Sequence, residues 1–245
     1  MGRPVVTVAS GGMAVVDVTS TTKVGNPVSE ATNGFGQAVT KVASGGMAVV
    51  YGAPDTGSGP VIYTTWNPAD QLNMTLTNGN LTATATNATA RVRAVKGTNT
   101  GKYYFEGTIT SPTSFAVYGI ANASAVNGQY TNWAYIQMTG SIYVNTSTIQ
   151  ATLSGVVSGS TIGVAVDLGA NLIWFRRCPS GSWNAASGST NDPASGIGGF
   201  SVSSIASGPL FPIFGVANSG DSVVGNFGAS GFNGAVPSGF AGWTA

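Results

Sequence analysis

Short runs in which apolar and polar residues alternate fill much of the chain after residue 61. The clearest run has apolar side chains at Ile162, Val164, Val166 and Leu168, separated by small or polar residues. Alternation with a period of two places successive side chains on opposite faces of a strand. No window shows apolar residues at a sustained helical spacing with caps at its ends. The pattern therefore predicts an all-β protein.

Similar runs predict further strands, separated by turns rich in Gly and Ser. They lie after Gly101 and at residues 114–120, 133–138, 141–144, 172–174, 210–216 and 223–227. Asn78-Gly79 lies between two runs that contain Thr and Leu, which is the signature of a type I′ hairpin. Many short strands of this kind favour an antiparallel β-sandwich, and residues 61–245 are long enough to bury a sizeable core.

The first part of the chain has a different organisation, because it contains an internal repeat. Residues 8–16 return letter for letter at 42–50, and a looser copy lies at 30–39. Such short runs bury too little apolar surface to offset an ordering cost of about 1–2 kcal/mol per residue. We therefore predict that residues 1–54 are an extended anchor that packs on the rest of the chain, on sister copies or on a larger particle. Its expected contact residues are Val8, Met13, Val15, Phe35, Val42, Met47 and Val49.

A stretch rich in Gly, Ser and Pro at residues 55–60 is expected to be a linker, which leaves 61–245 as the sandwich. Charged residues make up only 7% of the chain and the formal net charge is +1, so no basic surplus favours nucleic acid as a partner. The absence of His excludes catalytic triads and zinc sites that depend on it. A single Cys permits no intrachain disulfide and no thiolate metal cluster, so no metal or cofactor is expected.

The N-terminus leads into no sustained apolar run, and no stretch approaches the roughly 18 apolar residues of a membrane helix. We therefore expect no signal peptide and no membrane partner. Because a secreted β protein often uses disulfides and this chain has a single Cys, we also expect folding in a reducing cytoplasm.

Several segments resemble the SPRY family, whose members are concanavalin-like β-sandwiches, and especially the SPRY domains of bacteriophage particle proteins. The resemblance begins with the segment Trp66-Asn67-Pro68-Ala69-Asp70 and the Asn78-Gly79 hairpin. It continues with Gly101-Lys102-Tyr103-Tyr104-Phe105-Glu106, with Gly163-Val164-Ala165-Val166-Asp167-Leu168 and with Leu172-Ile173-Trp174-Phe175. It ends with Asn226-Phe227-Gly228, Pro237 and Phe240. Residues 118–149 and 178–205 show no family pattern.

The Ala-Ser-Gly-Gly repeats are similar to those that precede various domains in phage structural proteins. The resemblance implies a non-enzymatic virion component, made in the host cytoplasm, that acts as a decoration, spike or fibre protein. Its partners would be other virion proteins of the capsid or tail, sister copies (with a trimer preferred) and host surface glycans. Two alternatives stay open: a polysaccharide depolymerase, and a peptide-binding SPRY interaction module.

Aromatic residues outside regular alternation are the candidate ligand contacts, because flat rings stack on sugar C–H faces while nearby amides bond to hydroxyls. These candidates are Tyr130, Trp133, Tyr135, Trp183 and Asn184. Trp183 is the best single candidate because it lies in a Gly/Ser loop, although a role in anchoring that loop is the commoner outcome. Trp66, Trp174 and Trp243 are assigned to the core or to a domain seam.

Charged side chains offer fewer candidates. A glycosidase needs two carboxylates close in space, whereas Asp70, Glu106, Asp167, Asp192 and Asp221 are isolated in sequence. For Glu106 and Asp167 we favour capping or a buried hydrogen bond, and for Asp192 an Asx-type turn over a calcium site.

The basic residues have structural interpretations as well. A strand sends Arg176 and Arg177 to opposite faces, and we favour a solvated strand end for this pair over recognition of an acidic sugar. Arg91 and Arg93 share one face of a strand, which we expect to be a protected edge strand and not a site for acidic polysaccharide. Cys178 is expected to be a small buried or half-buried residue without a nucleophilic role.

Overall fold

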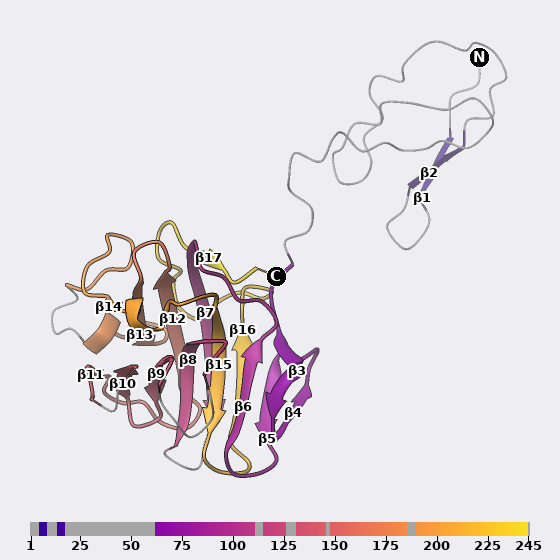
Figure 1. Ribbon diagram of the computed structural model, residues 1–245. Coiled ribbons are helices and arrows are strands. Elements are labelled where there is room, and N and C mark those ends of the chain that lie inside the picture. Colours follow the sequence, from indigo (N-terminus) through magenta and orange to yellow (C-terminus); the bar gives the residue numbers. More distant parts are fainter. Residues whose placement is uncertain are drawn as a thin grey trace. The chain divides into compact units, whose positions relative to one another are not determined.

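The computed structural model describes residues 5–8, 14–17, 62–110, 115–125, 131–145, 148–185 and 190–244 (Figure 1). The chain divides into two compact units, Met1–Val61 and Ile62–Ala245. In the first unit, β1 (Val5–Val8) pairs antiparallel with β2 (Ala14–Asp17). Val8 and Val15 of the predicted anchor lie in these two strands. The other predicted anchor residues lie outside the described residues: Met13, Phe35, Val42, Met47 and Val49.

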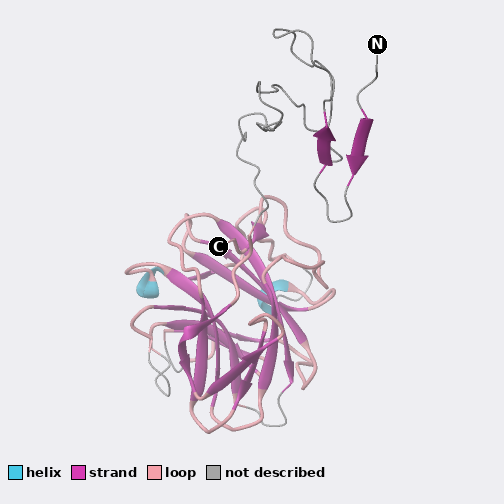
Figure 2. Cartoon of the chain, turned by 90° about the vertical axis from the view of Figure 1, so that its right-hand side faces the viewer, coloured by secondary structure: helices cyan, strands magenta, loops and turns pink. Residues whose placement is uncertain are grey.

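The second unit is a sandwich of two antiparallel sheets (Figure 2). The first sheet has the order β11 (Ala151–Thr152), β10 (Ser141–Val144), β9 (Trp133–Gln137), β8 (Ala116–Asn122), β15 (Leu210–Val216), β6 (Ala90–Ala94) and β3 (Trp66–Leu72). The second has the order β14 (Phe200–Ser201), β13 (Leu172–Arg177), β12 (Thr161–Asp167), β7 (Lys102–Thr110), β16 (Ser222–Asn226), β5 (Thr82–Ala85) and β4 (Met74–Thr77). In addition, β17 (Ala241–Gly242) runs parallel to β7. The two described helical turns are η1 (Trp183–Ala185) and η2 (Ser203–Ile205).

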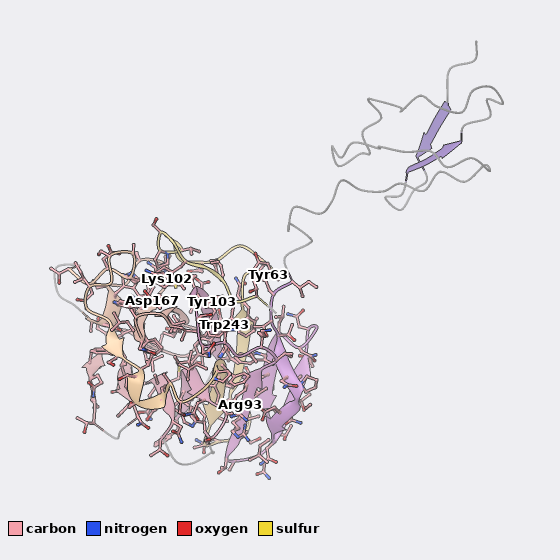
Figure 3. The ribbon with its side chains drawn as sticks, turned by 45° about the horizontal axis from the view of Figure 1, so that its top comes forward. Tyr63, Arg93, Lys102, Tyr103, Asp167 and Trp243 are labelled. Carbon is pink, nitrogen blue, oxygen red and sulfur yellow. The ribbon has the colours of Figure 1, made fainter. Side chains whose placement is uncertain are left out.

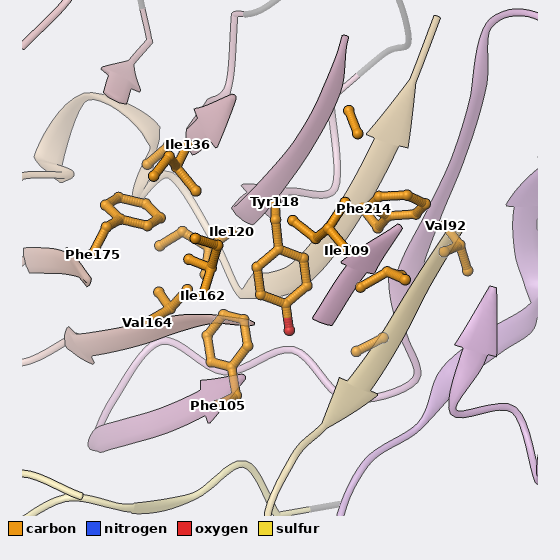
Figure 4. Packing of buried hydrophobic residues seen from close by; sticks show 14 of the residues in the cluster. Val92, Phe105, Ile109, Tyr118, Ile120, Ile136, Ile162, Val164, Phe175 and Phe214 are labelled. Carbon is orange, nitrogen blue, oxygen red and sulfur yellow. The ribbon is translucent and has the colours of Figure 1, made fainter. Parts of the chain in front are cut away.

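The main core lies between the facing sides of the two sheets (Figure 4). Phe105 and Ile109 of β7 point into it, as the alternation of that segment predicts, and pack with Tyr118 and Ile120 of β8. Burying such side chains is worth about 1.5–3 kcal/mol each, so this layer supplies most of the driving force for folding. The three tryptophans predicted to be internal are fully buried: Trp66, Trp174 and Trp243.

The fold confirms the predicted all-β sandwich and its strands, with boundaries that shift by one or two residues in β8, β9 and β16 and by three residues at the end of β13. It also confirms the hairpin between β4 and β5, in which Asn78 and Gly79 both have positive φ. Thr77 pairs with Thr82, so the loop has four residues, and the Leu81 N–H closes it by donating to the Asn78 carbonyl at 3.1 Å.

The prediction that Arg91 and Arg93 protect an edge strand is wrong, because β6 lies between β15 and β3 inside the first sheet. The two arginines do share one face, where both contact the carboxylate of Asp70 on the edge strand β3. The Arg91 Nη1–Asp70 Oδ1 distance is 3.1 Å, and the Arg93 Nε–Asp70 Oδ2 distance is 2.7 Å. Arg93, labelled in Figure 3, is buried and also donates to the carbonyls of Asn122 and Ala123. These arginines therefore join strands and are not a free basic patch.

The N-terminal and C-terminal segments of the second unit lie side by side. Tyr63 forms an antiparallel bridge with Thr244, and the buried indole of Trp243 donates from Nε1 to the carbonyl of Lys96 at 3.0 Å (Figure 3). The ring of Tyr103 on β7 packs against the same indole at 4.8 Å between centroids. No helix in the described part of the chain is both long enough and apolar enough to cross a bilayer.

Candidate binding site

The outer face of the second sheet carries the candidate site. Because side chains alternate along β7, Tyr104, Glu106 and Thr108 lie on the face opposite Phe105 and Ile109. The register brings Thr161 of β12 beside Thr108, and the two hydroxyl oxygens are 2.8 Å apart. This face therefore places hydroxyl groups next to a carboxylate.

Residues 228–240, here called the C-terminal strap, are held against that face by Glu106. The carboxylate accepts hydrogen bonds from the backbone N–H groups of Asn233 and Gly234, both at 2.7 Å. It also accepts the hydroxyl of Tyr104 at 2.6 Å. Glu106 is only 2% exposed, so these donors replace the hydrogen bonds to water that its side chain loses on burial. The expected role of Glu106, a buried hydrogen-bonded carboxylate, is confirmed.

Arg176 holds the same strap from the neighbouring strand β13. Its guanidinium donates to the Ala235 carbonyl and lies 4.4 Å from the centroid of the Trp183 ring. The prediction of a solvated strand end is wrong for Arg176, because the strap and Trp183 bury it. Arg177 is exposed, so the two side chains do point to opposite faces.

Tyr104 and Cys178 complete this buried polar cluster. Burial raises the pKa of Tyr104 far above its ordinary value, and hydrogen bonds to Cys178 and Glu106 act in the same direction. The phenol therefore stays protonated and serves as a donor. Burial likewise raises the pKa of the Cys178 thiol, whose sulfur lies 3.4 Å from Glu106 Oε1. Cys178 is a buried, free cysteine, as expected, and its raised pKa disfavours the nucleophilic thiolate.

An open pocket of about 430 Å³ lies beside the strap. Its walls come from β7, β12, β16 and the strap, and consist of Glu106, Thr108, Thr161, Val224, Asn226, Ser230, Gly231, Phe232 and Asn233. One lining residue is charged, and its carboxylate already accepts hydrogen bonds from the strap. The remaining lining groups are hydroxyls, amides, backbone and two apolar side chains. This chemistry suits an uncharged ligand that has many hydroxyl or amide groups.

Of the predicted ligand contacts, Trp183 packs against Tyr104 and Arg176 of the buried polar cluster. It is half-buried and stands edge-on to Tyr104 at 6.3 Å between ring centroids, and the Arg176 guanidinium lies over its ring. Asn184 is buried, and its side chain bonds to the backbone of Phe175, Ile173 and Gly198. Asn184 therefore fixes the loop onto β13.

The other candidates lie elsewhere. Trp133 and Tyr135 are on the outer face of the first sheet, where both are buried, and Tyr135 stacks on Tyr143 at 5.0 Å between centroids. Tyr130 lies outside the described residues. Among the described candidates, Trp133 and Tyr135 therefore pack together in one cluster and Trp183 in another.

The carboxylates of Asp167 and Asp192 have structural partners. Asp167 accepts the Ala170 N–H at 3.0 Å and pairs with Lys102 at 3.0 Å (Figure 3), which confirms its expected hydrogen-bonding role. Asp192 accepts the Ala194 N–H at 3.0 Å, which is the predicted Asx-type turn. Among the described residues, no three His, Cys, Asp or Glu side chains are grouped so that they could hold a metal ion.

No local pattern in the sequence predicts the whole pocket, although one signal for it is present. The outward positions of residues 102–110 and 161–167 can be read from alternation, but the strap that forms the wall lies about 120 residues beyond β7.

Comparisons with known proteins agree with this architecture. A family model for the SPRY domain matches residues 102–230. The SPRY domain of human HERC1 superposes with a TM-score of 0.50 at 16% identity, over 66% of this chain and 96% of that one. Stonustoxin (TM-score 0.47, 15% identity) is matched over 66% of this chain and 27% of its own, and the PSpry domain of TRIM65 (TM-score 0.47, 12% identity) over 66% and 90%. A search of the curated proteins found no match.

The family model spans more than half of the chain and covers β7 through β16, which carry the Glu106 cluster and most of the pocket. The two-sheet fold is the same as that of a solved SPRY domain. This protein belongs to the SPRY domain family.

Proposed function

We propose that this protein is a non-catalytic component of a bacteriophage or phage-like particle, in which the SPRY domain binds a partner and residues 1–54 attach the chain. SPRY domains are generally interaction modules, which supports the binding role. The letter-for-letter repeat at residues 8–16 and 42–50 supports an attachment segment built from a duplicated unit. Attachment in many copies, with a trimer as the preferred oligomer, gives avidity without strong individual contacts.

The observation that carries the binding role is the pocket beside the strap. Its single carboxylate accepts two backbone N–H groups and a phenol, which fixes the wall of the pocket in place. A pocket that is already formed loses little entropy when a ligand binds. Apart from that carboxylate, the lining is uncharged and mostly polar, which supports a partner with many hydroxyl or amide groups, and a host surface glycan is the partner we favour.

The strand register argues against the alternative of a polysaccharide depolymerase. Such enzymes need two carboxyl groups within about 5–9.5 Å of each other. Glu106 pairs with Gly163, four residues from Asp167 on β12, which separates these two carboxylates by about 13 Å along the strand. Asp221 is five residues from Asn226, the partner of Glu106 on β16, which separates them by about 16 Å.

Comparing the full chain with residues 62–245 tests the proposal. The contacts divide at Val61, so the shorter chain is expected to fold and to adsorb to the same bacterial cells as the full chain. The full chain is expected to be oligomeric by light scattering and to cosediment with the phage or phage-like particles. The shorter chain is expected to be monomeric and not to cosediment with them. A monomeric full chain that does not cosediment, or a purified chain that shortens a bacterial polysaccharide, would overturn the proposal.

A further inference from the structure

The second sheet presents rows of threonine across five neighbouring strands. Met74, Ala83 and Val223 point into the core, so the residues on either side of each lie on the outer face. The register then aligns one residue from each strand into a first row: Thr77, Thr82, Val224, Thr108 and Thr161. Each of these side chains is exposed or half-buried.

A second row runs beside the first over four of these strands. It consists of Thr75, Thr84, Ser222 and Thr110. Neighbours within a row are about 4.8 Å apart, and the two rows are about 7 Å apart along the strands. Eight of the nine side chains carry a hydroxyl group, and none is charged.

We propose that these two rows, here called the threonine track, bind a neutral linear polysaccharide that runs across the strands and ends in the pocket beside the strap. The inference deepens the proposed function and rests on its binding role. A threonine offers a hydroxyl and a methyl group together, so each position can bond to a sugar hydroxyl and pack against a sugar C–H face. Extended sugar chains repeat at a length close to the spacing between strands, which allows successive sugars to meet successive threonines.

Charge decides which polysaccharide fits. A track without any Lys or Arg offers nothing to pair with uronate, sulfate or phosphate groups, and burying such a group unpaired is costly. Neutral sugars carry no such penalty. The same argument disfavours a basic or acidic peptide as the occupant.

The twist of the sheet favours a single chain over a flat solid surface. Adjacent strands rotate by about 20–25°, so a row that crosses five strands winds through about a quarter turn. A rigid lattice, such as ice or a crystalline polysaccharide, touches only part of such a row. A single flexible chain can follow it from β4 to β12.

The track and the pocket are continuous. Thr108, Thr161 and Val224 belong to both, and Phe232 and Asn233 of the strap form the wall at this end. An aromatic ring beside amide and hydroxyl groups is suited to hold a terminal sugar. The pocket therefore sets where the bound chain ends, and the rows set its direction.

Affinity gel electrophoresis of the full chain tests the inference. The probes are hydroxyethyl cellulose, mixed-linkage β-glucan and glucomannan as neutral linear chains, and hyaluronate as an acidic one. We expect at least one neutral chain to retard the protein and hyaluronate not to. Thr82→Arg, which places a bulky charge at the second of the five positions of the first row, is expected to weaken that retardation at least tenfold, and Thr108→Val by a smaller factor.

Thr152→Arg is the matched control, because Thr152 is an exposed threonine on β11 of the other sheet, and it is expected to bind like the unchanged chain. Urea unfolding of each variant shows that the fold is kept. Equal retardation of Thr82→Arg and the unchanged protein would overturn the inference, as would thermal hysteresis in freezing solution without polysaccharide binding, which would assign the track to ice.

The outcome also separates this inference from the function on which it rests. If the full chain adsorbs to bacterial cells but no neutral chain retards it, the track is not a polysaccharide site and the binding role stands. If it neither adsorbs nor is retarded, both fail.

Discussion

Glu106 joins two distant parts of the chain through one side chain. Its two oxygens accept hydrogen bonds from β7 and from the strap, and the sulfur of Cys178 lies at 3.4 Å from one of them. These donors satisfy the hydrogen-bonding capacity of a side chain that is only 2% exposed. The position of the strap, and so the wall of the pocket, depends on this residue.

We therefore expect Glu106→Gln to destabilise the protein by about 1–3 kcal/mol, because the new amide N–H₂ is a donor that faces donors. The measurement is urea unfolding of the full chain followed by tryptophan fluorescence. Asp192→Asn is the control and is expected to change stability by less than about 0.5 kcal/mol, since asparagine also forms an Asx turn. Equal effects of the two substitutions would show that Glu106 does not hold the strap.

For Glu106, the direction of the side chain is predictable from the sequence, but its hydrogen-bond partners are not. The outward direction of Glu106 and the burial of its neighbours follow from alternation within β7 alone. Its donors at Asn233 and Gly234 follow from where the strap folds back, which no local pattern specifies. Arg176 was misjudged for this reason: the strap that buries it lies almost 60 residues further along the chain.

The pairing of β8 with β9 leaves no space for a side chain at Gly119. A Cβ atom at Gly119 would lie 2.1 Å from the carbonyl oxygen of Ala134 and 2.7 Å from the Cα of Tyr135. Both are backbone atoms, which cannot rotate away. Only a residue without a side chain permits the two strands to approach this closely.

Gly119→Ala is accordingly expected to lower the free energy of unfolding by about 1–3 kcal/mol, because the strands must separate to admit the methyl group. Gly208→Ala is the matched control, since a Cβ atom there meets nothing within 4 Å. The measurement is the denaturant midpoint of each variant, which should fall further for Gly119→Ala than for Gly208→Ala. A loss at position 208 as large as that at 119 would contradict the explanation.

Strand positions were largely predictable, whereas their order in the sheets was not. Alternation and Gly-rich turns located β7, β12, β15 and β16 from local residues. The interior position of β6 depends on β3 and β15, which flank it from opposite parts of the sequence. The threonine track was missed for the same reason, because the alignment of Thr82 with Thr108 through Val224 exists only after the sheet has formed.

At the scale of the whole domain, acid is expected to weaken the fold. Burial raises the pKa of the Asp70 carboxyl, but hydrogen bonds and charge from Arg93 and Arg91 lower it further, so the net pKa is below the ordinary value. For Asp167, burial is likewise outweighed by the Ala170 N–H and Lys102. A carboxyl with a lowered folded pKa stabilises the protein above its unfolded pKa, and this stability is lost as pH falls below about 4.

Unfolding free energies measured between pH 6 and pH 2.5 test this expectation. Asp70→Asn should be less stable than the unchanged protein at pH 6, and the difference should shrink as the pH falls, because protonation removes the same charge. A difference that stays constant over this range would mean that the ion pairs of Asp70 contribute nothing to stability.

The bridge between Tyr63 and Thr244 has a consequence for how the domain can be combined with other proteins. Because the N-terminal and C-terminal ends of the sandwich lie next to each other, the domain can be inserted into a surface loop of a host protein without distorting that loop. Such a graft would leave the threonine track, on strands β4 to β12, intact and available as a portable module.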